Sequence, residues 1–169
     1  MILAQLKEYL DANGVKYMLI THSRAYTAQE IADTAHIPGR EVAKTVMVVI
    51  DGVMTMIVIP GCDMVDFRLL KRALSCGEAR LATEEEFARL FPGCETGAMP
   101  PFGNLYNLPV IASERLAQDE YIAFNAGTHR DLVRMAYADF ERLVAPRVVD
   151  ISVPRRSHAD STGKYEPTE

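Results

Sequence analysis

The alternation of apolar and polar residues predicts several short strands, and the clearest pair surrounds Asp51-Gly52. β-branched runs at 46–50 and 53–59 flank this dipeptide. Asp-Gly between two such runs favours a type I′ turn, so we predict a β-hairpin here. Shorter runs with the same character predict further strands at 17–21, 110–112, 121–125 and 132–136.

Helical spacing and capping signals separate these strands. Apolar residues recur on one helical face between positions 2 and 10, and Asn13-Gly14 supplies the residues that favour a helix end. Thr27-x-x-Glu30 and Thr83-x-x-Glu86 are predicted capping boxes, and Asp66 is a predicted N-cap. A last helix is expected around positions 140–143.

Short strands joined by hairpins and interrupted by helices favour the α+β class. We therefore predict a single domain over residues 1–153, with a curved mixed or antiparallel sheet flanked by helices. From Pro154 the composition becomes polar and apolar periodicity ends, so residues 154–169 are predicted to form a flexible tail.

Composition and charge limit the function classes. Of the 169 residues 49% are hydrophobic, yet no run reaches the length of a membrane span, and no signal sequence is recognisable; we expect a cytoplasmic protein. Cys62, Cys76 and Cys94 lack C-x-x-C spacing and are expected to be reduced thiols, and no histidine spacing suggests a metal or cofactor.

The net charge of −5 argues against a protein that coats DNA through a broad basic face. It leaves room for local contact with the end of a nucleic acid. Arg24, Arg40, Lys44 and Arg130 are the candidate cations for such contact.

Two features of the sequence suggest catalysis or ligand binding: the segment 97–103 and Lys44. The uncharged segment 97–103 contains two glycines and the pair Pro100-Pro101, which predicts a stiff loop that offers backbone N–H groups; a purely structural turn is the alternative. Lys44 begins the most hydrophobic strand-like run. It either covers apolar surface with its aliphatic stem or directs a cation at a phosphate or carbonyl.

Four segments in order resemble one known family over about residues 1–145: His22 with 25–32, then 42–45, then Gly97-x-x-x-Pro101-Phe102-Gly103, and finally 125–129. The chain resembles the YbaK/EbsC-type aminoacyl-tRNA deacylases, which include the editing domain of bacterial prolyl-tRNA synthetases and its free-standing relatives. Many relatives have an aspartate after the loop, where this chain has Ser113 and Glu114. Whether Glu114 takes its place is open.

The resemblance implies the site residues. It implies catalytic roles for Lys44 and Gly97, with Lys44 anchoring the terminal nucleotide or the carbonyl. It also implies substrate contacts from His22, Tyr26, Thr27, Ala98, Met99, Pro100, Pro101, Phe102, Gly103, Asn125 and His129. His129 could line the aminoacyl pocket or be an ordinary surface or core histidine.

The implied reaction is hydrolysis of the ester in a mischarged aminoacyl-tRNA. An activated ester needs a held carbonyl and a positioned water or sugar hydroxyl, so no serine or cysteine nucleophile is required. A pocket bordered by Ala98, Met99 and Phe102 suits alanine, serine, threonine or cysteine. The expected partners are the tRNA acceptor end and an aminoacyl-tRNA synthetase. The alternative is a catalytically silent relative that binds a nucleotide, a tRNA end or a synthetase.

Overall fold

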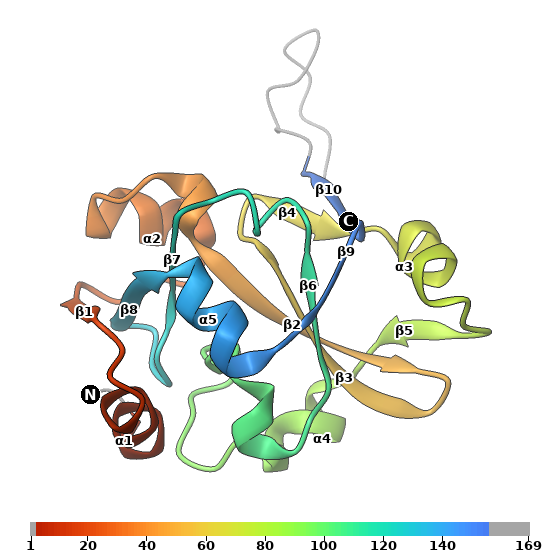
Figure 1. The fold of residues 1–169 in the computed structure, drawn as a ribbon, viewed down its shortest axis with the longest axis horizontal. Coiled ribbons are helices and arrows are strands. Elements are labelled where there is room, and N and C mark those ends of the chain that lie inside the picture. Colours follow the sequence, from red (N-terminus) through yellow and green to blue (C-terminus); the bar gives the residue numbers. More distant parts are fainter. Residues whose placement is uncertain (1–2, 156–169) are drawn as a thin grey trace, which may run out of the picture.

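The computed structural model describes residues 3–155 of the chain (Figure 1). The helices are α1 Ala4–Ala12, α2 Ala28–Ala35, α3 Phe67–Leu74, α4 Glu84–Phe87 and α5 Tyr137–Val144. The strands are β1 Tyr17–Thr21, β2 Ala43–Ile50, β3 Val53–Pro60, β4 Asp63–Val65, β5 Ala79–Leu81, β6 Val110–Ser113, β7 Tyr121–Asn125, β8 Asp131–Ala136, β9 Arg147–Val149 and β10 Ser152–Pro154.

The described strands pair in three sets. A mixed sheet has the order β5-β2-β3-β6-β9, in which β6 runs parallel to both of its neighbours. An antiparallel sheet has the order β1-β8-β7, and β4 pairs with β10. A parallel bridge from Val42 to Ala123 joins the first two sheets. The predicted α+β class with a mixed sheet is confirmed, although its hydrogen bonding is divided among three sets.

The predicted hairpin is present as β2 and β3. Asp51 and Gly52 have φ angles of 47° and 84°, as a type I′ turn requires. β2 begins at Ala43, three residues before the predicted run, and pairs Lys44 with Ile59. Lys44 therefore lies within the strand, where the backbone fixes the direction of its side chain.

The capping predictions have different outcomes. Asp66 accepts hydrogen bonds from two backbone N–H groups of α3, and Thr83 with Glu86 forms a complete capping box. The box predicted at Thr27 is half wrong. Thr27 Oγ1 accepts from the Glu30 N–H, but the Glu30 carboxylate accepts from the Thr27 hydroxyl instead of its backbone N–H.

An aromatic cluster centres on Phe102. Its ring centroid lies 6.2 Å from that of Tyr9, 5.6 Å from Phe124 and 5.8 Å from Phe140. The Phe102 side chain has no exposed surface. Phe102 was predicted to border the substrate pocket; the structure places it in the core, behind the loop, where it can act only through packing.

β10 was not predicted and includes Pro154, the first residue of the predicted tail. It pairs with β4, and the Arg155 N–H continues the contact by donating to the Cys62 carbonyl at 2.9 Å. Because Pro154 is paired with β4, the start of the predicted tail belongs to the folded domain. Residues 156–169, which make up the rest of the predicted tail, lie outside the described residues.

We predict that Gly103→Ala destabilises the protein without backbone strain as the cause. A Cβ at Gly103 would lie 2.5 Å from Val110 Cγ2 and 3.0 Å from the Leu108 carbonyl oxygen. Overpacking of this kind costs about 1–3 kcal/mol in the free energy of unfolding. Urea unfolding measures it, and an unchanged midpoint would contradict the close packing of this glycine.

Candidate functional site

Lys44 lines a cleft of about 390 Å³, which lies between the start of β2 and the N-terminal end of α2. The cleft is lined by Tyr26, Thr27, Gln29, Gly39, Lys44, Gly61, Cys62 and Arg155. This places three of the predicted site residues, Lys44, Tyr26 and Thr27, around one cavity. No carboxylate is among the described residues that line it.

The Lys44 ammonium is in an unfavourable electrostatic position. Burial lowers the pKa of Lys44 below its usual value, and the nearby Arg155 guanidinium lowers that pKa further. The carboxylate of Asp63 and the Cys62 thiol act in the opposite direction and are weaker than burial. A cation kept at such a cost is typical of a site that binds an anion.

The loop 97–103 is held to β2 next to Lys44. The Thr45 hydroxyl donates to the Met99 carbonyl at 3.1 Å. The Ala98 N–H donates to the Glu95 carbonyl, and the Ala98 carbonyl accepts from the Gly127 N–H at 2.9 Å. Pro100 and Pro101 are buried. The predicted stiffness of the loop thus comes from hydrogen bonds at both ends of Ala98-Met99 and from packed prolines.

Gly97 is exposed and has a φ of +83°, in the left-handed region. Its N–H donates to the Met99 thioether sulfur at 3.3 Å. A thioether is a weak acceptor, so a carbonyl or oxyanion of a ligand can replace it at little cost. Gly97 therefore carries a weakly satisfied backbone donor on a loop held by hydrogen bonds, and its contact with a substrate stays a prediction.

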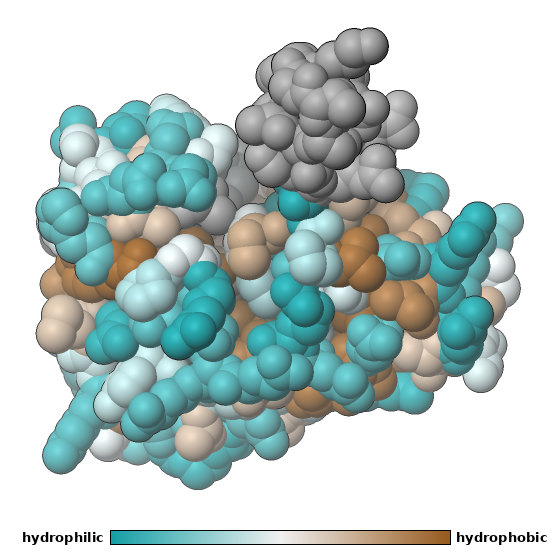
Figure 2. Space-filling model, turned by 90° about the horizontal axis from the view of Figure 1, so that it is seen from above, coloured by the Kyte–Doolittle hydropathy of each residue, from teal (hydrophilic) through white to brown (hydrophobic). Residues whose placement is uncertain are grey.

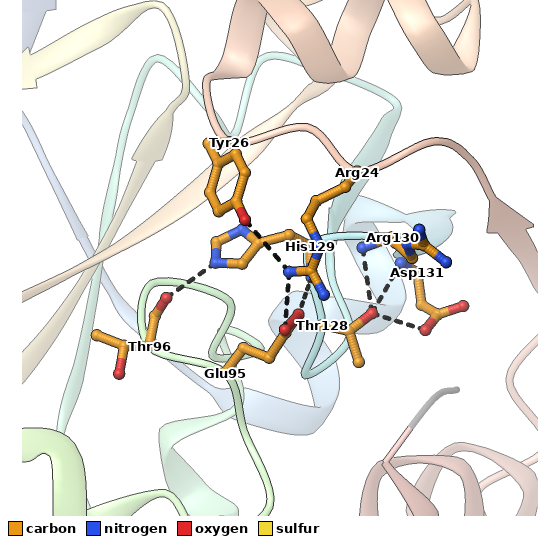
Figure 3. A network of polar contacts seen from close by, with 8 residues as sticks. All are labelled: Arg24, Tyr26, Glu95, Thr96, Thr128, His129, Arg130 and Asp131. Carbon is orange, nitrogen blue, oxygen red and sulfur yellow. Dashed lines mark hydrogen bonds and ion pairs between the residues drawn. The ribbon is translucent and has the colours of Figure 1, made fainter.

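His129 supports this loop from behind (Figure 3). Its Nε2 lies 2.9 Å from the Thr96 carbonyl oxygen, so Nε2 carries the proton and donates. Its backbone N–H donates to the Glu95 carboxylate at 2.7 Å, and that carboxylate pairs with Arg24 at 2.8 Å. The hydrogen bond from the His129 N–H has the largest effect in lowering the pKa of Glu95, and the hydrogen bond from Arg24 lowers this pKa further.

Tyr26 joins the cleft to the loop. Its ring lies on the His129 ring with centroids 4.4 Å apart, and 61% of its surface is exposed. It also lines the Lys44 cleft. Sequence alone could not find this stack, because the two residues are about a hundred positions apart and only the antiparallel β1-β8 pairing brings their segments together.

Other predicted residues lie outside the cleft lining. The His22 N–H donates to the Arg130 carbonyl, and its Nε2 is buried without a partner among residues 3–155. Asn125 ends β7 opposite Leu132, and its Oδ1 is likewise buried and unpartnered among the described residues. Arg40 pairs with Asp119 at 3.6 Å, away from Lys44.

The position of the family's aspartate is occupied by a buried polar cluster. Glu114 is exposed, whereas the Ser113 hydroxyl lies 2.7 Å from the Ser152 hydroxyl. Ser152 Oγ donates to Asp63, a fully buried carboxylate that also accepts from Arg115 at 2.6 Å. Glu114 therefore lies outside this buried cluster. The buried carboxylate of this region comes from Asp63 on β4.

In the part of the chain from 3 to 155, no cluster of three or more His, Cys, Asp or Glu side chains could hold a metal ion. No helix in that part has the length and apolarity needed to cross a membrane. Cys62, Cys76 and Cys94 are free thiols.

Comparison with known proteins defines the class. The model of the aminoacyl-tRNA editing domain matches residues 22–143, and the chain belongs to this family. The proline–tRNA ligase of Shouchella clausii (strain KSM-K16) is 28% identical over 125 residues, which cover 68% of this chain and 22% of the ligase. The chain thus spans about a fifth of that relative's length.

Solved structures share the fold. The hypothetical protein APE2540 has a TM-score of 0.79 at 22% identity, covering 88% of this chain and 99% of its own. A candidate trans-editing enzyme for prolyl-tRNA synthetase has a TM-score of 0.74 at 24% identity, covering 88% of this chain and 95% of its own. Both matches extend over nearly the whole described domain.

We predict that Lys44→Met stabilises the protein, and most strongly at neutral pH. The pKa of Lys44 is lower in the folded state than in the unfolded state, so its positive charge lowers the free energy of unfolding. The full penalty applies at every pH below the folded-state pKa. The penalty shrinks as pH rises and vanishes above the unfolded value of 10.5. The difference in unfolding free energy between Lys44→Met and the natural protein should therefore narrow from pH 7 to pH 10.5. A variant less stable than the natural protein at pH 7 would contradict the burial of this ammonium.

Proposed function

We propose that this protein hydrolyses the ester of a mischarged aminoacyl-tRNA that carries a small amino acid. The proposal rests on the Gly97 N–H, because within residues 3–155 this part-buried donor has only the weak Met99 sulfur as its acceptor, and the Thr45–Met99 bond holds the loop in place. Membership of the editing-domain family supports it. Such a reaction belongs in the cytoplasm, where tRNA is aminoacylated.

The substrate occupies two parts of the site. The terminal adenosine lies in the cleft with Lys44 and Tyr26, which combines a cation with an exposed aromatic ring. The ester carbonyl lies at Gly97. Of the two roles that the family resemblance implied for Lys44, the cleft lining favours the nucleotide anchor, because it contains Lys44 and excludes the loop.

The chemistry needs a polarised carbonyl and a water. Water adds to the ester carbon, and the Gly97 N–H stabilises the negative charge that develops on the carbonyl oxygen. The bond to the ribose oxygen then breaks, and the proton lost by the water passes to that oxygen. The products are the free amino acid and a tRNA with its terminal hydroxyl restored.

The size of the amino acid follows from the closeness of the loop to the core. Ala98, Met99 and Phe102 are buried and packed into the core, which leaves little room for a large side chain next to Gly97. Alanine and serine are the favoured substrates, ahead of threonine and cysteine. Editing is needed for such residues because a synthetase gains only about 1–3 kcal/mol of discrimination per methylene.

A panel of mischarged tRNAs tests this function. Purified protein should release alanine or serine from tRNA faster than it releases larger amino acids, with correctly charged prolyl-tRNA as the comparison. The readout is loss of labelled aminoacyl-tRNA with time. Failure to hydrolyse any member, by protein of normal melting temperature, would favour the catalytically silent alternative.

We predict that Gly97→Ala reduces turnover much more than stability. A Cβ at Gly97 would lie 3.5 Å from His129 Cε1, an ordinary contact, so the stability cost comes from φ alone and should be about 1 kcal/mol. Relaxation of the strained φ should turn the Gly97 N–H away from the carbonyl oxygen and slow hydrolysis at least about tenfold.

Gly93→Ala is the matched control. Gly93 has the same φ of +83°, lies outside the cleft lining, and would bring its Cβ no closer than 3.4 Å to Leu3 Cδ2. It should lose similar stability and keep its activity. Equal turnover losses in the two variants would show that strain alone explains the effect at Gly97.

A further inference from the structure

The Lys44 cleft contains a second cation, Arg155, which lies beyond the residues 22–143 that the family model matches. Arg155 follows β10, and its N–H donates to the Cys62 carbonyl at 2.9 Å. Cys62 itself lines the cleft. The backbone at Arg155 is thus fixed to the cleft wall.

Buried hydrogen bonds hold β10 in this position. Ser152 lies in β10 with 1% of its surface exposed, and its hydroxyl donates to Asp63 at 2.8 Å. The Ser113 hydroxyl, from the end of β6, lies 2.7 Å from that of Ser152. The cluster connects β10 to β4 and β6, so the approach of Arg155 to Lys44 is a property of the packed fold.

Neither cation of the cleft makes an ion pair within residues 3–155. Within residues 3–155, six other arginines make ion pairs, at positions 24, 40, 80, 115, 134 and 142. Lys44 and Arg155 make none there, and no carboxylate lines their cavity. Two unpaired like charges in one cleft repel each other, and an anion between them removes that repulsion.

An aromatic ring stands at the same cleft. Tyr26 is 61% exposed, and its far side is supported by His129 at 4.4 Å between centroids. Bases stack on rings of this kind in proteins that bind single-stranded nucleic acid. Figure 2, which looks onto the side with α2 and β10, shows hydrophilic and hydrophobic patches interspersed.

We propose that Lys44 and Arg155 together bind the 5′-phosphate of the substrate's terminal adenosine, with the adenine stacked on Tyr26. Arg155 supplies a planar guanidinium that can hold two phosphate oxygens, and Lys44 supplies a compact charge in the same cleft. The inference rests on the proposed function and identifies the part of the substrate that the cleft recognises.

Binding of an uncharged RNA hairpin with a single-stranded CCA end tests the inference without catalysis. Fluorescence anisotropy over a series of KCl concentrations compares the natural protein with Arg155→Ala. The variant should bind about five- to tenfold more weakly at low salt. The slope of log affinity against log salt should fall by about 0.7, the value for one phosphate contact on a single strand.

Arg89→Ala is the matched control. Arg89 is an exposed arginine beside α4, at the opposite end of the molecule from β10 in Figure 1, and its loss changes the net charge equally. It should bind as the natural protein does. If Arg155→Ala and Arg89→Ala have the same affinity and salt slope as the natural protein, the inference is overturned.

A second measurement uses minimal substrates that carry the amino acid identified by the tRNA panel. The natural protein should have a lower KM for the aminoacyl ester of adenosine 5′-monophosphate than for that of adenosine. Arg155→Ala should narrow this preference through a higher KM for the phosphorylated ester, because Lys44 remains, and an undiminished preference would refute the Arg155 phosphate contact. If the tRNA panel shows no hydrolysis, the proposed function fails, while the RNA-binding test still decides the role of Arg155.

Discussion

The site depends on the alternation of side chains along β2. This strand lies between β5 and β3, and successive residues point to opposite faces of the sheet. Ala43 and Met47 belong to the core around Phe102, whereas Val48 belongs to the core beneath α3. Thr45 therefore faces the Gly97 loop, and Lys44 faces the cleft. A substrate that contacts both must cross the start of β2, where Tyr26 spans the two sides.

The loop combines stiffness with an available donor. Fixed donors stabilise a developing charge without reorganising at the moment of reaction, and the buried prolines and the Thr45–Met99 bond provide that fixity. Met99 serves two purposes. Its carbonyl anchors the loop to β2, and its sulfur occupies the Gly97 N–H with a bond weak enough to be exchanged for a ligand. For the proposed reaction, the loop that holds this donor is thus fixed before substrate binds.

Local signals in the sequence predicted local structure well. Asp51-Gly52 specified its hairpin, and Asp66 its helix start, because each acts within a few residues. The three-residue strands β4 and β10 were not predicted, since segments this short form only through pairing with distant chain. The loop and Lys44 were found from composition and resemblance. Phe102 was predicted at the substrate pocket and lies in the core. The Tyr26–His129 stack and the place of Arg155 in the cleft were not predicted. Long-range packing decides whether such side chains enter the core or a cleft.

The most direct test of the account is the amide resonance of Gly97 during titration with two ligands. One is adenosine 5′-monophosphate, and the other is its non-hydrolysable 3′-alanylamide, which adds a carbonyl at the position of the ester. Both ligands should shift the amide resonances of residues in the Lys44 cleft, and only the alanylamide should shift the Gly97 amide resonance strongly. A Gly97 amide that does not move while the cleft is saturated with the alanylamide would contradict the central role of this loop.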